Sequence, residues 1–372
     1  MRPLILLFSA AVALAQCQPQ SIVRHTFEGD TEGWMVMGSN GSVKVSADAK
    51  SGKGALQFSY SLDGKGFSTA ILPAGAGRLA DMRRIRFWVK ADHDTALAIV
   101  LAEKKPGGGD YSNLVWAPAN VWQHIDLSLT EFVSNDGPND AVDPDGKLDP
   151  DQVEGIGIVD FSTFFNQMPE AMPMVVTRKS GMHHLLIDDF EVLDGAAAET
   201  KPKPETALID SFDRGFSQWI TFGGMSLTLS PSDNPIGGPA LAASLKAVEG
   251  KLAIMMRRTN SGEFTGMKRL AFDIAAEHEG TFAISIETMK SGSGGGPGPR
   301  YNFMIYPPEG RKVFHVNVKL SDFEHDENSP DDPAGQIEAS RIKSIAIGDI
   351  SALTGGAAID KKIWIGRVEM LK

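Results

Sequence analysis

Apolar and polar residues alternate with a period of two along much of this chain. In one run, three residues that share a face alternate with three that share the other: Ile85, Phe87 and Val89 against Arg84, Arg86 and Trp88. The same alternation recurs at 97–101 and 124–129. Successive side chains of a strand point to opposite faces of its sheet, so each run predicts a β-strand with one buried face.

These runs are short and are separated by Gly, Pro, Asn and Asp, which is typical of antiparallel strands joined by turns. No segment shows a long helical period with capping residues, and no helix is predicted that could connect parallel strands. The pattern therefore predicts an all-β fold, namely a sandwich or jelly roll.

The sequence contains an internal duplication. Four pairs of segments match in the same order: 26–34 with 211–219, 82–92 with 267–277, 124–132 with 315–323, and 186–193 with 364–371. The offset is 185 residues at first and drifts only in loops. A period of this length is too long for a solenoid repeat or a propeller blade, so each copy is predicted to be a domain.

We therefore predict two tandem antiparallel β-sandwich (jelly-roll) domains, at 22–193 and 208–372. Between them, the segment 194–207 alternates Lys with Pro at its centre and has the composition of a short, stiff linker.

The first fifteen residues have the pattern of a signal peptide. One Arg precedes a short apolar run, and Ala13 and Ala15 form an A-x-A cleavage site, so the mature chain is predicted to begin at Gln16. Cys17, the only cysteine, excludes an intrachain disulfide and raises the alternative of a lipid anchor. Because Gln16 stands where a lipoprotein signal has a small residue, we favour export to the periplasm or the extracellular space without an anchor.

Composition and charge narrow the classes of partner. A net charge of −11 argues against nucleic acid or an anionic membrane as the partner, because both attract basic surfaces. The hydrophobic fraction of 42% is sufficient for two cores, and no segment after the signal is long and apolar enough to cross a membrane.

Several segments together resemble the galactose-binding-like jelly-roll fold: "TFEGDTEGW", "GALQFSYSL", "VWQHIDLSLTEF" and "LLIDDFEVL". Within it, the chain is most similar to non-catalytic carbohydrate-binding modules of the family 11 type, with a weaker likeness to the complex I intermediate-associated family. The resemblance covers nearly the whole mature chain, once per copy. It implies an exported protein that binds carbohydrate without catalysis.

The resemblance also implies a structural calcium ion in the first copy. Glu28 and Asp188 would be its side-chain ligands, together with backbone carbonyls from the loops at 38–53. Calcium binds six to eight oxygen atoms, and a cation would offset the burial of acids in an apolar strand. In the second copy Gly366 and Arg367 replace Asp188 and Asp189, so no ion is expected there. Arg367 is predicted to pair with Asp213.

The predicted binding surface is the non-core face of the first copy. Sugars are bound by aromatic rings and by planar polar side chains. The candidate residues on this face are Arg86, Trp88, Gln57, His124 and Asp126. The second copy has Ala271 and Asp273 where the first has Arg86 and Trp88, so it is expected to bind weakly or not at all.

Two other classes of function remain open from the sequence. One is a structural or protein-interaction module at the cell surface. The other is a glycan-active enzyme, for which His124 and Arg86 with Tyr111 or Asn113 could form a lyase site. Asp188 and Asp189 are neighbours on a strand and are expected to point to opposite faces, so they do not form a glycosidase pair. The pair His183–His184 beside acids is compatible with a transition metal, although a junction between loop and strand is favoured.

Overall fold

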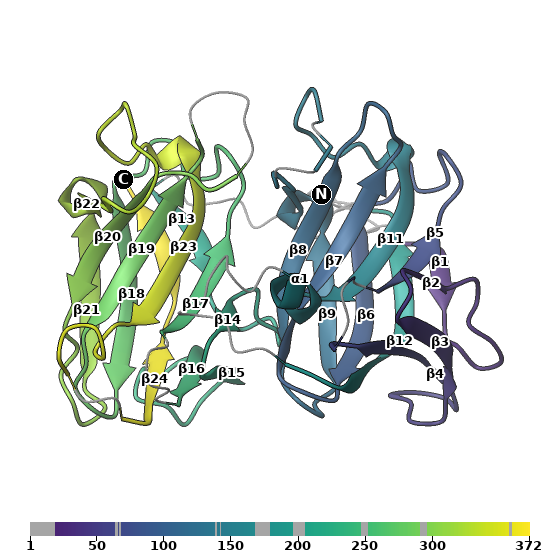
Figure 1. Ribbon diagram of the computed structural model, residues 1–372, viewed down its shortest axis with the longest axis horizontal. Coiled ribbons are helices and arrows are strands. Elements are labelled where there is room, and N and C mark those ends of the chain that lie inside the picture. Colours follow the sequence, from purple (N-terminus) through teal and green to yellow (C-terminus); the bar gives the residue numbers. More distant parts are fainter. Residues whose placement is uncertain are drawn as a thin grey trace, which may run out of the picture.

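The computed structural model describes residues 19–63, 66, 68–137, 140–141, 143–167, 179–195, 205–246, 252–290, 296–356 and 359–372. The predicted signal peptide and Cys17 lie outside this part of the chain. The described residues form two β-sandwiches that lie side by side (Figure 1).

The first sandwich is built from two antiparallel sheets of six strands each. Sheet A has the order β3 (Gly41–Ser46), β4 (Ala55–Ser61), β12 (Met182–Leu193), β6 (Arg84–Ala91) and β9 (Gln123–Ser128), and β1 (Ser21–His25) also pairs with β12. Sheet B has the order β10 (Val133–Ser134), β8 (Asp110–Ala117), β7 (Thr95–Glu103), β11 (Val153–Asp160), β5 (Thr69–Pro73) and β2 (Met35–Met37).

The second sandwich repeats this arrangement with two further antiparallel sheets. Sheet C has the order β13 (Thr206–Asp210), β25 (Val368–Leu371), β18 (Arg269–Ala276), β24 (Lys361–Ile365), β16 (Ala240–Leu245) and β15 (Met225–Ser230), and β21 (Val313–Lys319) pairs with β18. Sheet D has the order β14 (Ile220–Phe222), β17 (Ala253–Arg258), β23 (Ile342–Asp349), β19 (Phe282–Thr288), β20 (Arg300–Ile305) and β22 (Glu324–His325).

Helices are short in the described residues. One α-helix, α1 (Ser162–Gln167), follows β11, and four single 3₁₀ turns lie at Leu129–Glu131, Pro150–Gln152, Leu320–Asp322 and Ala339–Arg341. The predicted all-β class with two tandem sandwiches is confirmed. The predicted domain boundaries stay predictions, although the strands of the two sandwiches begin at Ser21 and at Thr206.

The duplication extends to strand order and backbone conformation. From β2 in sheet B and from β14 in sheet D, the strands that are equivalent in the duplication follow one another in the same order. Phe27 and Phe212, which are equivalent in the duplication, both have a positive φ, of 57° and 59°. A bulky residue rarely adopts this left-handed conformation, so its occurrence in both copies shows that the same tight corner follows the first strand of each sandwich.

The two sandwiches share a buried interface. On β7 and β8, Ala96, Ala98, Leu114 and Trp116 point away from their own core and pack into the core cluster of the second sandwich. Strand β14 contacts both β7 and β8, and Figure 1 shows it on the side of its sandwich that faces the first. The Trp116 indole donates a hydrogen bond of 2.9 Å to the Leu227 carbonyl. The outer face of β7 and β8 is therefore covered by the second sandwich.

Candidate functional site

The five predicted ligand-binding residues lie on one face, the outer face of sheet A. Arg86 and Trp88 alternate on β6 with the buried residues Ile85, Phe87 and Val89, and His124 and Asp126 are their direct neighbours on β9. Gln57 lies on β4, separated from β6 by β12. The period of two in the sequence placed these side chains correctly, because the strands are regular here.

An aromatic pair lies at the centre of this face. The rings of Trp88 and His124 are 4.9 Å apart between centroids, and the ammonium of Lys50 lies 4.2 Å from the centre of the Trp88 ring. Lys50 is exposed, and it comes from the loop between β3 and β4. A ligand that stacks on Trp88 would therefore share the ring with Lys50 or displace it.

Charged side chains flank this aromatic pair, and each has a partner. Arg86 pairs with Glu191 of β12, and Arg24 lies 3.5 Å from the same carboxylate. The Arg84 side chain donates to Asp126. The face thus presents planar guanidinium and carboxylate groups in fixed orientations beside an aromatic ring.

Part of the equivalent face of the second sandwich is covered by its own loop. Trp364 is buried there among Ala240, Ala242 and Ala275, with Ile236 packed against them. These alanines are buried, whereas Asp273 and His315, at the positions of Trp88 and His124, are exposed. The difference between the two copies is larger than the replacement of Trp88 by Asp273 alone.

The predicted calcium ligands both contact the loop that follows β3. Asp188 is fully buried, and its carboxylate accepts hydrogen bonds from the amides of Lys50 (2.8 Å), Ser51 (2.9 Å) and Asp189 (2.8 Å). Glu28 accepts the amide of Lys53. The loop contributes N–H donors at these acids, whereas calcium needs carbonyl oxygens. Burial nevertheless raises the pKa of Asp188 against the effect of these amides, so a cation there would still offset a cost.

The expectation that Asp188 and Asp189 point to opposite faces is wrong. The ladder between β12 and β6 shifts register after Asp188, and Asp189 has a φ of 46°. This bulge turns the second carboxylate, so that the Ser51 amide binds Asp188 while the Ser51 hydroxyl binds Asp189 at 2.8 Å.

Two further expectations are corrected. Arg367 pairs at 3.0 Å with Glu369, two residues further along the chain, and not with Asp213. The Asp213 carboxylate accepts a hydrogen bond from the Ser211 hydroxyl. The residues of the lyase alternative are not assembled either. Tyr111 and Asn113 are buried on β8 in sheet B, whereas His124 and Arg86 lie on the outer face of sheet A.

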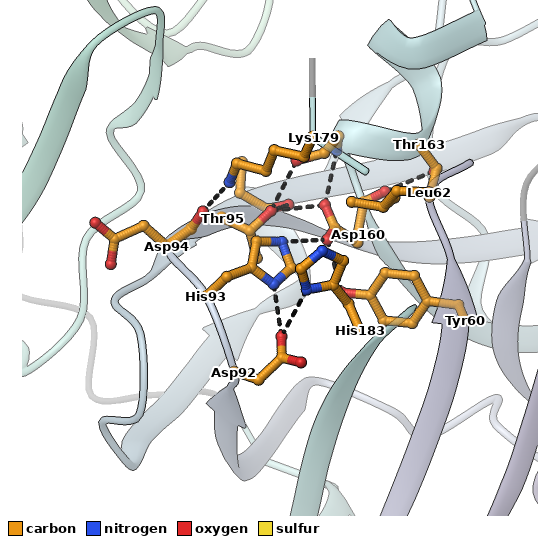
Figure 2. Close-up of polar contacts among 12 residues, drawn as sticks. Tyr60, Leu62, Asp92, His93, Asp94, Thr95, Asp160, Thr163, Lys179 and His183 are labelled. Carbon is orange, nitrogen blue, oxygen red and sulfur yellow. Dashed lines mark hydrogen bonds and ion pairs between the residues drawn. The ribbon is translucent and has the colours of Figure 1, made fainter. Parts of the chain in front are cut away.

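A second polar cluster lies at one end of the first sandwich (Figure 2). Asp160, at the end of β11, is fully buried and accepts the hydroxyls of Tyr60 and Thr95, both at 2.6 Å, and the Ser162 amide at 2.7 Å. Nε2 of His93 lies 2.9 Å from the same carboxylate, as a close ion-pair contact without good hydrogen-bond alignment.

The imidazoles of His93 and His183 lie with their centroids 4.0 Å apart and their planes tilted by 46°. Their Nδ1 atoms both face one oxygen of Asp92, at 2.7 Å and 3.2 Å (Figure 2). The other Asp92 oxygen accepts the His184 amide at 3.0 Å and lies 3.1 Å from Nδ1 of His184. Three histidines and two aspartates therefore meet where the β6–β7 turn crosses the start of β12.

Electrostatics in this cluster favour charged carboxylates. Burial acts to raise the pKa of Asp160, but the contacts with His93, Thr95 and Tyr60 outweigh it and lower this pKa to about 2. The pKa of Asp92 is likewise lowered, because contacts with the histidines outweigh its partial burial. The cluster borders a cavity of about 200 Å³ that is lined by both sandwiches, including Trp116 and Phe222.

Sequence reasoning noted His183 and His184 but missed the other members of this cluster. Tyr60, Asp92–His93 and Asp160 come from three separate segments, and no local spacing connects them. The available signal was the row of polar residues at 92–95, just where the alternating pattern of β6 ends.

No protein-family model and no curated protein sequence matches this chain. Solved structures are similar to it. A family 11 carbohydrate-binding module from Clostridium thermocellum, in complex with a beta-1,3-1,4-mixed-linked tetrasaccharide, covers 46% of this chain and 97% of its own, with 16% identity and a TM-score of 0.38. The tandem CBM22-1–CBM22-2 domain of Paenibacillus barcinonensis Xyn10C covers 97% of this chain and 100% of its own, with 12% identity and a TM-score of 0.31.

These similarities agree with the resemblance to carbohydrate-binding modules that the sequence motifs indicated. At this identity and TM-score they carry no argument about a ligand or its binding face. In the described ranges, no helix is long and apolar enough to cross a lipid bilayer.

Proposed function

We propose that this protein binds poly- or oligosaccharide on the outer face of sheet A in the first sandwich, without catalysing a reaction. The observation that supports this proposal most directly is the pair of half-buried rings, Trp88 and His124, on the outer face of sheet A between fixed charged groups. Aromatic rings stack on the apolar faces of sugars, and oriented planar polar groups bind their hydroxyls.

The location is supported by exclusion among neighbouring faces. The outer face of β7 and β8 in sheet B is covered by the second sandwich, and Ile236 packs over the part of the outer face of sheet C around Trp364. The outer face of sheet A has neither cover. Carbohydrate binding is therefore proposed for the first sandwich, because the second has Asp273 where the first has Trp88.

The test is binding of the mature chain to a glycan array, followed by titration of the best glycan into Trp88→Ala. Truncating a desolvated aromatic residue at a binding site typically costs about 2 kcal/mol, or roughly thirtyfold in affinity. Trp88 lies outside the core, so the melting temperature should change little. His315→Ala is the matched control, since it removes an exposed ring at the position of the second copy that is equivalent to His124 and should leave affinity unchanged.

If Trp88→Ala keeps full affinity, the binding face lies elsewhere. If no glycan binds and a protein partner is captured specifically through this face, the interaction-module alternative takes its place. Release of reducing ends or unsaturated uronate from the glycan would replace the non-catalytic proposal with the enzymatic one.

Calcium in the first sandwich remains a proposal, with Glu28 and Asp188 as ligands. Binding to the native state alone adds about 2.7 kcal/mol of stability at a hundredfold excess over Kd. Chelation should therefore lower the melting temperature of the chain, and it should accelerate hydrogen exchange in the first sandwich but not in the second. If the unfolding transition is insensitive to chelator, Asp188 is stabilised by its hydrogen bonds to backbone amides and not by calcium.

Export also remains a proposal, because residues 1–15 lie outside the described part of the chain. Mass spectrometry of the exported protein should find Gln16 as its first residue. Acylated Cys17 at the N-terminus would show instead that the protein is anchored to a lipid membrane.

A further inference from the structure

In the polar cluster around Asp92 and Asp160, neutral histidines have too few N–H protons for the contacts that their ring nitrogens make. Nε2 of His183 faces the Ser180 carbonyl at 3.0 Å, and Nε2 of His93 faces Asp160, so both of these nitrogens must carry the proton of a neutral ring. The two Nδ1 atoms then direct lone pairs at an oxygen of Asp92, which is also an acceptor. Two additional protons, or one divalent cation, would make these contacts favourable.

The second copy shows how the same position can be filled. Asp349 is equivalent to Asp160, and Lys361 is equivalent to His183. The Lys361 side chain is 1% exposed, and its ammonium lies 3.0 Å from Asp349. The frame around it is also repeated, because Glu277 accepts the Lys362 amide just as Asp92 accepts the His184 amide. A buried cation therefore occupies this place in the second sandwich as part of the chain itself.

We propose that a divalent transition-metal ion of the zinc type binds in the first sandwich between Nδ1 of His93, Nδ1 of His183 and a carboxylate oxygen of Asp92. Their three ligand atoms lie within 4.8 Å of one another. Tetrahedral zinc with bonds of about 2.0–2.1 Å separates its ligand atoms by about 3.3 Å, close to the 2.7 Å and 3.2 Å contacts to Asp92.

The surroundings match the outer shell of a metal site. A histidine ligand usually donates its other N–H to a carboxylate or a backbone carbonyl, which fixes the tautomer and orients the ring. The Ser180 carbonyl holds this position for His183, and the Asp160 carboxylate lies 2.9 Å from Nε2 of His93 without an aligned hydrogen bond. Two imidazoles and one carboxylate favour zinc, copper or nickel over calcium, which prefers oxygen ligands.

The experiment is titration of ZnCl₂ into the full mature chain, purified without a histidine tag and stripped with chelator. We expect one ion per chain, together with a rise in melting temperature. His183→Lys, which introduces the residue of the second copy, should weaken zinc binding at least tenfold while preserving a folded protein. The matched control is His315→Gln, because His315 forms a His–Asp pair with Asp273 on an exposed face.

Diffraction data collected at the zinc edge should place the ion among His93, His183 and Asp92. The proposal is overturned if wild type binds no zinc, if His183→Lys binds it as tightly as wild type, or if His315→Gln removes it. Displacement of zinc by equimolar calcium would likewise contradict nitrogen ligation.

A separate observation concerns the interface between the sandwiches. In that interface, Ile220 and Phe222 of β14 are buried against β7 and β8, where Leu114 and Trp116 lie. The equivalent positions at the two free ends of the molecule are exposed. Met35 and Met37 of β2 are 53% and 52% exposed, and Met304 and Tyr306, at the end of β20, are 42% and 66% exposed.

The contact between the sandwiches is heterologous, since an edge strand of one docks on a sheet face of the other. A heterologous contact that does not close can be repeated indefinitely. From this we infer that a second copy of the chain docks its β2 edge, through Met35 and Met37, on the β19–β20 face of the first. Ser285 and Glu287 replace Val100 and Ala102 on that face, so this contact should be weaker than the internal one.

Sedimentation velocity over a range of concentrations tests this inference. Wild type should form head-to-tail assemblies whose mass rises with concentration. Met37→Asp and Tyr306→Asp each block one end, so each alone should remain a monomer, whereas their equimolar mixture should form a complex of two chains and no larger species.

The mixture is the sharp control, because each variant retains the surface that the other has lost. A mixture that stays monomeric would overturn the inference, as would self-association of a chain with both substitutions. Monomeric wild type at the highest soluble concentration would do the same, and would assign these faces to a partner of different sequence.

Discussion

A buried tyrosine holds an acidic loop in the same way in both copies. The Tyr111 hydroxyl donates to Asp143, and the equivalent Tyr301 hydroxyl donates to Asp332 at 2.8 Å. Asp143 belongs to an acidic segment whose composition resembles a calcium loop. The structure gives this carboxylate a packing role, because its hydrogen bond ties the loop to a strand of the core.

At the residue scale, Tyr301→Phe should lower the stability of the second sandwich by about 1.5–3 kcal/mol at pH 7, the range for hydrogen bonds to charged groups. Burial acts to raise the pKa of Asp332, but Tyr301 and the Ala334 amide outweigh it, so this pKa lies below its usual value. A carboxyl group whose pKa is depressed in the folded state stabilises the fold above its unfolded pKa. This stabilisation is lost as the pH falls through the folded pKa. The effect, measured by urea unfolding, should therefore shrink below about pH 4. Tyr306→Phe, on an exposed side chain, should change nothing at either pH.

At the element scale, the bulge in β12 is coupled to the loop between β3 and β4. Asp188 binds the amides of Lys50 and Ser51, and Gly52 leaves room for Glu28, whose carboxylate would lie 1.7 Å from an added Cβ. Lys50 in turn lies over Trp88. The loop thus connects the buried acid to the proposed binding face.

Asp188→Ala should free this loop and destabilise the first sandwich by about 1–3 kcal/mol, because the amides of Lys50 and Ser51 lose a charged acceptor. The same substitution should accelerate hydrogen exchange at the backbone amides of Lys50 and Ser51. Asp48→Ala is the comparison within the loop. Asp48 pairs with Lys90, and the Asp48 side chain is 55% exposed. Loss of this ion pair should therefore cost less than about 1 kcal/mol of stability. Equal effects of the two substitutions would contradict the role given to Asp188.

At the scale of the whole molecule, the two sandwiches are joined by a core contact as well as by a linker. Trp116 is 3% exposed, and Phe216 of the second sandwich packs into the core cluster of the first. Arg258 adds hydrogen bonds across the contact to Ser112 and to the Ser134 carbonyl. The domains should therefore unfold in a coupled manner.

Trp116→Ala should weaken this coupling, since truncation of a buried tryptophan typically costs about 3–5 kcal/mol. Calorimetry should show one transition for wild type and two separated transitions for the variant. Tyr306→Ala, at the equivalent exposed position of the second copy, should keep the single transition. Two transitions already present in wild type would mean that the sandwiches unfold independently.

The sequence by itself determined the all-β class, the duplication and the assignment of Arg86, Trp88 and His124 to a non-core face. Alternation and internal matches are local properties of the chain, and they remain valid wherever strands are regular. Tertiary structure alone decided where the strand rule fails, as at the bulge after Asp188, and which outer faces are covered. It also brought Asp92, His93, Asp160 and His183 together. That cluster depends on how two sheets meet across the end of a sandwich, which no spacing along the chain encodes.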